Sequence, residues 1–365
     1  MLKRSRGLFA PALALMLSAC ASSVVAQPAG DPRIAEDGTV TMDGVRIPLP
    51  ATLSDEAKAY LRHLIVDKPF GSPVPGIAAE RARQDGIMGE FLRPMRERYK
   101  VEVSEETIAG IVADVVVPVD GIAPENRDRV LINLHGGGFT TGARSASLVE
   151  SVPLAALMKI KVISIDYRMA PEFQFPAASE EVEKVYRELL KTYDPSHIGI
   201  YGCSAGGFLT AQSTARLAGE GLPMPGAIGV FCAGLNGYFG GDSTALGGAL
   251  LGMLPPLPGA APPSPPADSG PPYMATAQAD DPLAYPIVSP DVLAKFPPTL
   301  FITGTRGFEF SSALNSHNKL AAAGVASRFH GWDAMFHGFF YNSELPESRE
   351  AYDVMVKFFD SHLAK

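Results

Sequence analysis

Short runs of β-branched and other apolar residues alternate with longer helical patterns along most of this 365-residue chain. Apolar runs of this length predict strands that are buried on both faces, and the segments between them, such as 178–192 and 207–218, are long enough for crossover helices. The alternation therefore predicts a doubly wound α/β fold with a mostly parallel sheet. The predicted strands lie at 108–117, 130–134, 161–165, 198–201, 227–231 and 299–303.

The first residues have the layout of a secretory signal. Lys3, Arg4 and Arg6 precede an apolar run at 8–17, which is too short for a membrane-spanning helix of about 20 residues. We assign residues 1–26 to a signal peptide and expect an exported bacterial protein, either periplasmic or lipid-anchored at the membrane.

Two cleavage schemes remain open for this signal. Residues 17–20 (LSAC) resemble the lipobox of bacterial lipoproteins, which would attach a lipid to Cys20 and tether the protein to a membrane surface. Residues 24–26 (VVA) instead suit an ordinary signal peptidase that cleaves before Gln27, in which case Cys20 is only a small residue of the signal tail.

The chain after the signal divides into three predicted parts. Two helical patterns, 54–66 with Ser54 as N-cap and 78–99 interrupted by Pro94, have no strands of their own, so we expect them to form a cap over the carboxyl edge of the sheet. The parts are a linker at residues 27–50, the helical cap at 51–105 and a catalytic domain at 106–365.

One segment of the catalytic domain is poor in core-forming residues. Between 237 and 272 the sequence is dominated by glycine, proline, alanine and serine, with repeated Pro-Pro pairs. This composition favours extended, irregular chain, and we expect an insertion that is a disordered loop or a flap.

Charge and cysteine content exclude two classes of partner. The net charge of −8 does not supply the concentrated basic surface that nucleic-acid binding needs. The three cysteines, Cys20, Cys203 and Cys232, are too few for a disulfide framework or a four-ligand zinc site. We expect neither nucleic acid nor metal, and the sequence does not decide whether Cys203 and Cys232 pair.

The chemistry concentrates at two glycine-rich turns, and the first is GCSAGG at 202–207. It follows a predicted strand and precedes a helical pattern. A serine between small residues in this context is typical of a nucleophile elbow, because the strand and helix approach too closely for larger side chains. We predict Ser204 as the nucleophile; the alternative is a glycine-rich turn without chemistry.

The second turn is HGGGF at 135–139, directly after another predicted strand. Successive glycines let backbone N–H groups converge on a developing oxyanion. We assign Gly137, Gly138 and Ala205 to this oxyanion hole, with Gly136 serving the turn or acting as a further donor. A phosphate-binding loop is the rival reading, but the turn has no Walker lysine and no GxGxxG pattern.

These two turns, with three further motifs, resemble the hormone-sensitive lipase family of bacterial esterases from about Leu53 to the C-terminus. The further motifs are DYR at 166–168, APE at 170–172 and FPA at 175–177. The resemblance implies an α/β-hydrolase fold with an N-terminal helical cap, and carboxylesterase activity on short acyl chains. It also implies that Asp166 and Arg168 are structural, and we expect them to form a partly buried ion pair that braces the sheet edge.

In this fold the triad residues follow the chain order serine, acid, histidine. The base should therefore be the last of the three in the sequence. His337 lies in a loop before the helical pattern 348–363, where the family's catalytic histidine falls. His135, at a strand end, suits a structural hydrogen bond better than catalysis, and His330 lies inside a predicted strand. We predict His337 as the base. The remaining histidines, His63, His197, His317 and His362, lie outside any motif.

The acid is where this sequence departs from the family. The usual aspartate follows the strand at 299–303, but Gly307 stands there, and Glu309 lies two positions later. Of the other nearby acids, Asp291 precedes the strand and Asp333 is too close in sequence to the histidine. We therefore predict that Glu309 orients the imidazole.

These assignments predict a serine carboxylesterase that hydrolyses short-chain acyl esters through an acyl-enzyme, with no cofactor. One alternative is a non-catalytic ligand-binding protein on the same fold, which the presence of both Ser204 and His337 argues against. Another is a deacetylase or amidase of the same mechanism. The expected partner is a small-molecule ester, and the sequence leaves the acyl preference and the oligomeric state open.

Overall fold

The computed structural model describes most of the chain after the predicted signal peptide. The described residues are 33–34, 36, 40–41, 44, 46–67, 69–71, 73–238, 240–251 and 272–364. The signal peptide with Cys20, and residues 252–271 of the predicted insertion, lie outside them.

The chain forms two compact units, Met1–Pro48 and Leu49–Lys365. In the first unit, β1 (Arg33–Ile34) pairs antiparallel with β2 (Val40–Thr41). Part of the segment predicted as a linker therefore forms a small two-stranded sheet.

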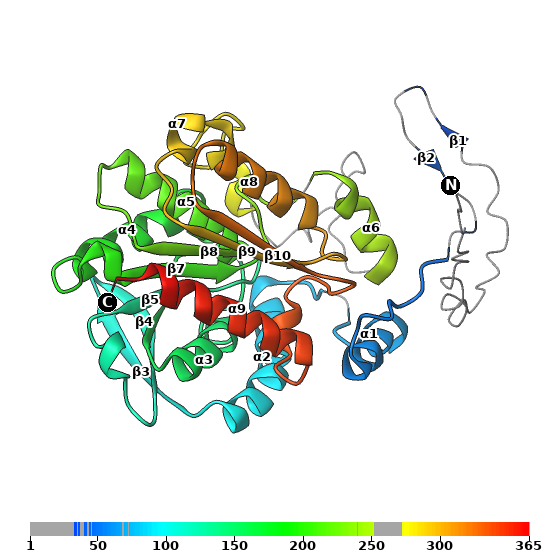
Figure 1. The fold of residues 1–365 in the computed structure, drawn as a ribbon, viewed down its shortest axis with the longest axis horizontal. Coiled ribbons are helices and arrows are strands. Elements are labelled where there is room, and N and C mark those ends of the chain that lie inside the picture. The colour runs from blue at the N-terminus through cyan, green and yellow to red at the C-terminus, as the bar shows by residue number, and fades with distance from the viewer. Residues whose placement is uncertain are drawn as a thin grey trace, which may run out of the picture. The chain divides into compact units, whose positions relative to one another are not determined.

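The second unit is built on an eight-stranded sheet with the strand order β10-β9-β8-β7-β5-β6-β4-β3 (Figure 1). The strands from β10 to β6 in this order are parallel, whereas β4 runs antiparallel to both β6 and β3. The predicted mostly parallel sheet is confirmed. The strands are β3 (Val101–Ile108), β4 (Ile111–Pro118), β5 (Val130–Leu134), β6 (Lys161–Ile165), β7 (Ile198–Cys203), β8 (Ala227–Phe231), β9 (Thr299–Gly304) and β10 (Ser327–Trp332).

Strand β3 was not among the predicted strands, and the expected cap boundary at residue 105 falls inside it. Its sequence carries Glu102, Glu105 and Glu106, which are exposed. Charged side chains are typical of an edge strand, because they discourage pairing with another molecule, but they also hide the apolar alternation. The sheet therefore begins at residue 101, earlier than the sequence indicated.

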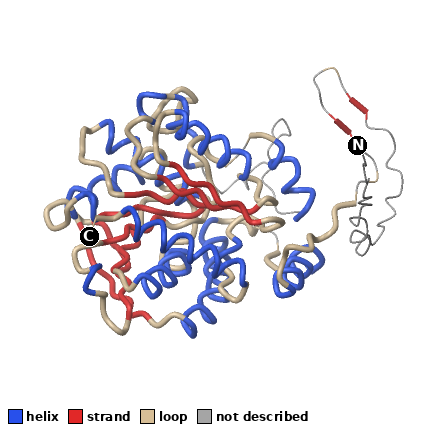
Figure 2. Tube along the Cα trace, viewed as in Figure 1, coloured by secondary structure: helices blue, strands red, loops and turns tan. Residues whose placement is uncertain are grey.

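Helices cover both faces of this sheet (Figures 1 and 2). On one face, Val152 and Phe359 belong to a core that includes α3 and α9. On the other face, Val182 and Leu209 belong to a core that includes α4, α5 and α8. These helices are α3 (Ala146–Met158), α4 (Ala177–Leu189), α5 (Ala205–Gly219), α8 (Phe310–Ala322) and α9 (Pro346–His362).

The two helices of the predicted cap are present as α1 (Asp55–Asp67) and α2 (Ile77–Arg98). Pro94 lies inside α2 and does not interrupt it, contrary to the prediction. A proline removes one helical hydrogen bond, and packing of the flanking turns can offset that loss. Met95, the next residue, is fully buried in the core.

The cap helices pack on loops that follow the carboxyl ends of the strands. The ring of Tyr60 in α1 lies 5.8 Å from that of Phe336, and the ring of Phe91 in α2 lies 6.5 Å from that of Tyr341. Both partners flank His337 in the sequence. The cap therefore contacts the loop that carries the predicted base.

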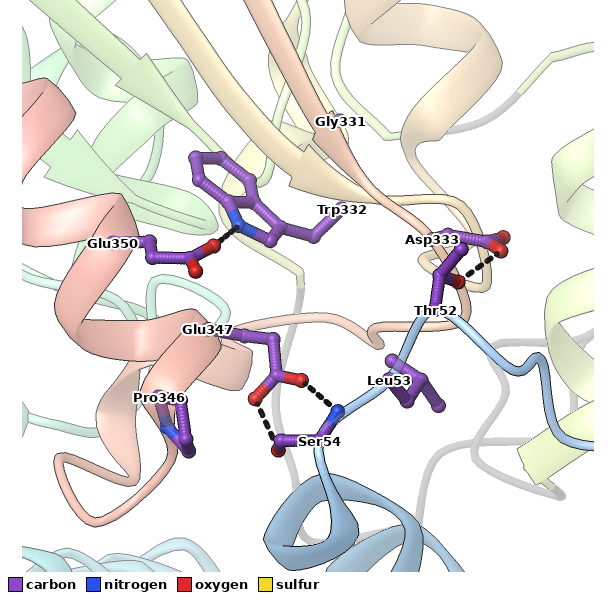
Figure 3. A pocket seen from close by; sticks show the side chains of 9 residues that line it. All are labelled: Thr52, Leu53, Ser54, Gly331, Trp332, Asp333, Pro346, Glu347 and Glu350. Carbon is purple, nitrogen blue, oxygen red and sulfur yellow. Dashed lines mark hydrogen bonds between the residues drawn. The ribbon is translucent and has the colours of Figure 1, made fainter.

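The start of α1 is joined to the start of α9 (Figure 3). Ser54 Oγ accepts a hydrogen bond from Ala57 N, which confirms Ser54 as the N-cap. The N–H and hydroxyl of Ser54 both donate to Glu347, at 2.7 and 2.9 Å. Thr52 also donates a hydrogen bond to Asp333. Thr52, Ser54, Asp333 and Glu347 all line one pocket. Residues far apart in the sequence thus close one end of the unit.

The predicted insertion at 237–272 begins with a helix, α6 (Asp242–Leu251), rather than with irregular chain. Glycines made a helix improbable on propensity, but tertiary packing overrides propensity. A β carbon on Gly247 would lie 3.1 Å from the Arg306 carbonyl oxygen, so a glycine there permits close packing. The remaining helices are α7 (Pro290–Leu293) and the 3-10 helices η1 (Pro124–Asn126), η2 (Pro195–His197), η3 (Tyr273–Thr276), η4 (Pro286–Val288) and η5 (Phe339–Tyr341).

Among the residues that the structure describes, no helix has the length and apolar character that crossing a membrane requires.

Candidate active site

Ser204 occupies a strained turn between β7 and α5, at the carboxyl end of the strand. Its φ and ψ are 58° and −122°, a conformation that is costly for a residue with a β carbon. The turn crosses β5 closely, since a β carbon on Gly202 would lie 2.1 Å from the Leu134 carbonyl oxygen, and one on Gly206 only 1.6 Å from it. The small residues predicted for a nucleophile elbow are therefore required by backbone contacts.

The close approach at Gly206 predicts a large loss of stability in a Gly206→Ala variant. Because the obstructing atom is backbone, no side-chain rotation relieves the overlap, and we expect the melting temperature to fall by more than about 10 °C. Gly219→Ala, at the other end of α5, is the control, because its new methyl would meet only Leu283 Cδ2 at 3.8 Å. Thermal unfolding measures both, and equal melting temperatures would contradict the role of this contact.

The oxyanion loop follows β5 and presents two glycines with positive φ, 120° at Gly137 and 63° at Gly138. Of the groups that the structure describes, none accepts a hydrogen bond from either N–H. The N–H of Gly136 differs, because it donates to the carboxylate of Glu150 at 2.8 Å. Gly136 N is therefore already bonded, which favours Gly137 and Gly138 over Gly136 as the oxyanion donors.

Glu309 contacts the imidazole of His337. His337 Nδ1 lies 2.9 Å from Glu309 Oε2, and Thr303 Oγ1 donates to Glu309 Oε1 at 2.6 Å. The carboxylate is fully buried. Burial favours a higher pKa for Glu309, but the charge of His337 and the hydrogen bonds from His337 and Thr303 together lower the pKa below its usual value. Glu309 is thus held ionised against the imidazole.

The position of the Glu309 carboxylate explains the glycine at 307. A β carbon on Gly307 would lie 2.4 Å from Glu309 Oε1 and 2.8 Å from its Cδ. The longer side chain of Glu309 therefore folds back into the space that a side chain at position 307 would fill. Neither Asp291 nor Asp333 has a hydrogen bond to His337 in the described part of the chain.

Contacts around the imidazole connect His337 with the nucleophile elbow. Its ring stacks on Phe308 with centroids 4.5 Å apart, and the ring of Phe308 lies 6.2 Å from that of Tyr238. Burial raises the pKa of Tyr238, and a side-chain hydrogen bond with Ser204 opposes part of that effect. Ser204, His337 and Glu309 therefore share one end of the sheet, after β7, β10 and β9.

Cys232 provides a second link between these strands. It directly follows β8, the neighbour of β7, and its sulfur accepts a hydrogen bond from Gly338 N at 3.3 Å. Cys203 and Cys232 are both buried free thiols. Burial raises the pKa of each, so the thiols stay protonated and neither competes with Ser204 as a nucleophile.

One atom each from Cys232, Glu309 and His337 lies within 4.8 Å of the other two, a spacing that is also compatible with a metal. In this structure, however, both Glu309 oxygens are bonded, to Thr303 and to His337. The contacts are those of an oriented imidazole.

Helix α6 braces the loop that carries Glu309. Ser243 Oγ donates to the Phe308 carbonyl oxygen at 2.9 Å and accepts from Ser311 N at 2.9 Å. These bonds fix the chain on both sides of Glu309. This support is not evident from the sequence, because the glycines and prolines of residues 237–272 favour irregular chain.

Two residues expected to be structural have the following contacts. His135 is fully buried, its Nδ1 lies 2.8 Å from the Gly136 carbonyl oxygen, and burial lowers its pKa to about 4, so it is neutral. Arg168 pairs with Glu180 and Glu181, at 3.1 and 2.8 Å, rather than with Asp166. The predicted Asp166–Arg168 pair is wrong because the N-terminal part of α4 brings two carboxylates to the guanidinium.

The sequence of this chain is similar to a known protein family and to several known hydrolases. Residues 131–341 match a family model described as the alpha/beta hydrolase fold. A putative acetyl-hydrolase, LipR, from Mycobacterium tuberculosis is 32% identical over 45% of this chain and 51% of its own length. An acetyl-hydrolase from Streptomyces hygroscopicus is 29% identical over 65% of this chain and 77% of its own. The match to the mycobacterial protein thus spans about half of that protein.

Solved structures of esterases match a larger share of this chain than these sequence relatives do. Esterase E25 superposes with a TM-score of 0.72 at 27% identity, and covers 88% of this chain and 98% of its own. An esterase from the bacterial hormone-sensitive lipase family has a TM-score of 0.72 at 24% identity over 85% of this chain and 99% of its own. At 24% identity the second likeness indicates the fold alone.

Proposed function

Because this chain belongs to the alpha/beta hydrolase fold family, we propose that it is a serine carboxylesterase with Ser204 as nucleophile, His337 as base and Glu309 as acid. The contact that carries the proposal is the 2.9 Å hydrogen bond between His337 and the buried Glu309. It fixes the imidazole at the sheet end where the strained turn presents Ser204.

The proposed reaction has two steps. His337 takes the proton of Ser204 while the serine oxygen attacks the ester carbonyl, and the N–H groups of Gly137, Gly138 and Ala205 bind the resulting oxyanion. The protonated imidazole, stabilised by Glu309, then gives its proton to the departing alcohol. In the second step His337 removes a proton from water, the hydroxide attacks the acyl-enzyme, and Ser204 regains its hydrogen as the acid leaves.

The relatives support ester hydrolysis, and two of them are acetyl-hydrolases by name. The aromatic rings of Tyr238 and Phe308 lie beside Ser204 and His337 and favour a small acyl group. We therefore propose short acyl esters as the substrates.

A series of p-nitrophenyl esters from acetate to laurate tests this proposal. We expect kcat/KM to be highest at two to four acyl carbons and to fall by at least about tenfold for long chains, because bulky rings beside the nucleophile disfavour a long acyl group. A maximum at ten or more carbons would contradict the short-chain assignment. Hydrolysis of the matching anilides, measured in parallel, distinguishes an esterase from an amidase.

The second candidate is a ligand-binding protein on the same fold. A fluorophosphonate probe separates the two, since covalent labelling needs an activated serine. We expect labelling of Ser204 alone, and an unlabelled folded protein would favour the binding function.

A further inference from the structure

A buried carboxylate outside the proposed triad lies at the junction of three functional segments. Glu150 belongs to α3 and is 5% exposed. Its Oε1 accepts hydrogen bonds from Gly136 N at 2.8 Å and Tyr341 Oη at 2.5 Å. Its Oε2 accepts from Asn133 Nδ2 at 2.9 Å and Cys203 N at 3.1 Å. Four donors therefore converge on one side chain.

The two backbone donors adjoin the groups that would bind the oxyanion. Gly136 immediately precedes Gly137 and Gly138, and Cys203 immediately precedes Ser204. One carboxylate thus bonds both backbone arms of the proposed oxyanion hole. An error in the separation of these arms would misplace the N–H groups, and oxyanion stabilisation depends steeply on donor position.

The third donor extends this connection to the histidine loop. Tyr341 ends η5, four positions after His337. A β carbon on Gly136 would lie 2.8 Å from Tyr341 Oη, 3.0 Å from the Cys203 carbonyl oxygen and 3.3 Å from Glu150 Oε1. The oxyanion loop, the nucleophile elbow and the histidine loop therefore meet at this carboxylate.

We propose that Glu150, in its ionised form, is a positioning residue that holds the oxyanion loop and the nucleophile elbow at the separation needed for oxyanion binding. This inference rests on the proposed function. The ionised form holds both arms more tightly, because a charged carboxylate is a stronger acceptor than a neutral carboxyl, and protonation leaves the Tyr341 hydroxyl to accept a hydrogen instead of donating one.

The surroundings of Glu150 make its ionisation sensitive to pH. Burial raises the pKa of Glu150 to about 7, although hydrogen bonds from Tyr341, Asn133, Gly136 and Cys203 each lower it. The titratable groups that face it from the neighbouring segments are all neutral, because burial raises the pKa of each. They are Tyr167, Tyr201, Cys203, Cys232 and Tyr341. Protonation should therefore begin as the pH falls toward 7, and the hydrogen bonds that hold the two arms should weaken below it.

Glu150→Gln tests the proposal with little change in volume. Whichever way the amide is turned, its NH₂ group faces either Gly136 N–H or Cys203 N–H, so one arm loses its acceptor. At pH 8 we expect kcat for p-nitrophenyl acetate to fall by about 10- to 100-fold with KM within about threefold, because substrate binding does not use these bonds. The rate of fluorophosphonate labelling of Ser204 should fall by a similar factor.

Val152→Ala is the matched control, since it removes buried contacts from the same helix without touching either arm. We expect it to lower the melting temperature and leave kcat within about twofold. A folded Glu150→Gln variant with wild-type kcat would overturn the proposal. So would an equal loss of kcat in Val152→Ala, because the effect would then follow stability rather than position.

Tyr341→Phe supplies a second readout that does not depend on the folding of Glu150→Gln. Losing a donor to the ionised carboxylate raises the pKa of Glu150. The part of the acid limb of the kcat–pH profile that is absent in Glu150→Gln should therefore move to higher pH by about 0.5 to 1 unit, whereas the part that Glu150→Gln retains belongs to His337 and should not move. An unmoved limb would overturn the proposal.

The labelling rate also separates this inference from the proposed function. If the wild-type protein hydrolysed no ester, the esterase assignment would fail, and the ratio of Ser204 labelling between wild type and Glu150→Gln would still test the positioning role. Absence of labelling in the wild type would overturn both.

Discussion

A Ser204→Ala variant is expected to fold like the wild type and to lose ester hydrolysis, with kcat for p-nitrophenyl acetate lower by at least about 10,000-fold. Alanine retains the β carbon that the turn already accommodates at a φ of 58°, so the strained backbone does not change. Only the nucleophilic oxygen is removed. Circular dichroism and thermal unfolding should be unaltered.

The double variant Ser204→Ala/His337→Ala sharpens this test. When residues act as one unit, the losses of kcat caused by substituting each of them do not add. We therefore expect the double variant to be no slower than Ser204→Ala alone. A further large loss would mean that His337 acts independently of Ser204. Retained hydrolysis in Ser204→Ala would refute the assignment of the nucleophile.

Glu309→Gln should lower kcat by about 1,000- to 10,000-fold, because an amide in place of the buried carboxylate disfavours the tautomer that accepts the serine proton and cannot stabilise the imidazolium. Asp333→Asn is the matched control. Asp333 lies in the same loop as His337 but accepts hydrogen bonds from Thr52 and Thr305 instead. Steady-state rates of both variants, with melting temperatures, decide between the two acids. Normal turnover in Glu309→Gln would place the acid elsewhere.

The overlap between position 307 and the Glu309 carboxylate allows a rescue experiment. In a Glu309→Ala background the obstructing oxygens, at 2.4 and 2.9 Å from a β carbon on Gly307, are gone. Gly307→Asp then offers a carboxylate from the usual position, and we expect the double substitution to regain at least about tenfold over Glu309→Ala alone, since a carboxylate there can again orient the imidazole. In the wild-type background, Gly307→Asp should destabilise the protein.

The sequence predicted those parts of the molecule that are determined by short stretches of neighbouring residues. The buried parallel strands and the Ser204 turn follow from short runs of residues, and the α/β-hydrolase fold that the resemblance implied is confirmed. Glu309 could be selected because few acids stand between β9 and His337. The sequence did not explain Gly307, because the carboxylate that fills its space returns from two residues further on.

The errors have a common physical origin in packing between distant segments. Helix α6 could not be predicted because Gly247 reflects close contact with the loop at Arg306 and Phe308 rather than a lack of structure. Arg168 was paired with the nearest acid in the sequence instead of the two that α4 brings to it. Glu150 drew no attention, because its four donors come from three separate segments.

The bond between Ser54 and Glu347 has a consequence for how the protein is made. The two residues are 293 positions apart, so α1 leaves the ribosome long before the carboxylate that bonds its N-cap residue has been synthesised. Closing so long a loop is slow compared with forming local helices and hairpins. Before α9 is present, the cap can pack on the histidine loop through Tyr60 and Phe91 but lacks the hydrogen bonds that tie the start of α1 to Glu347.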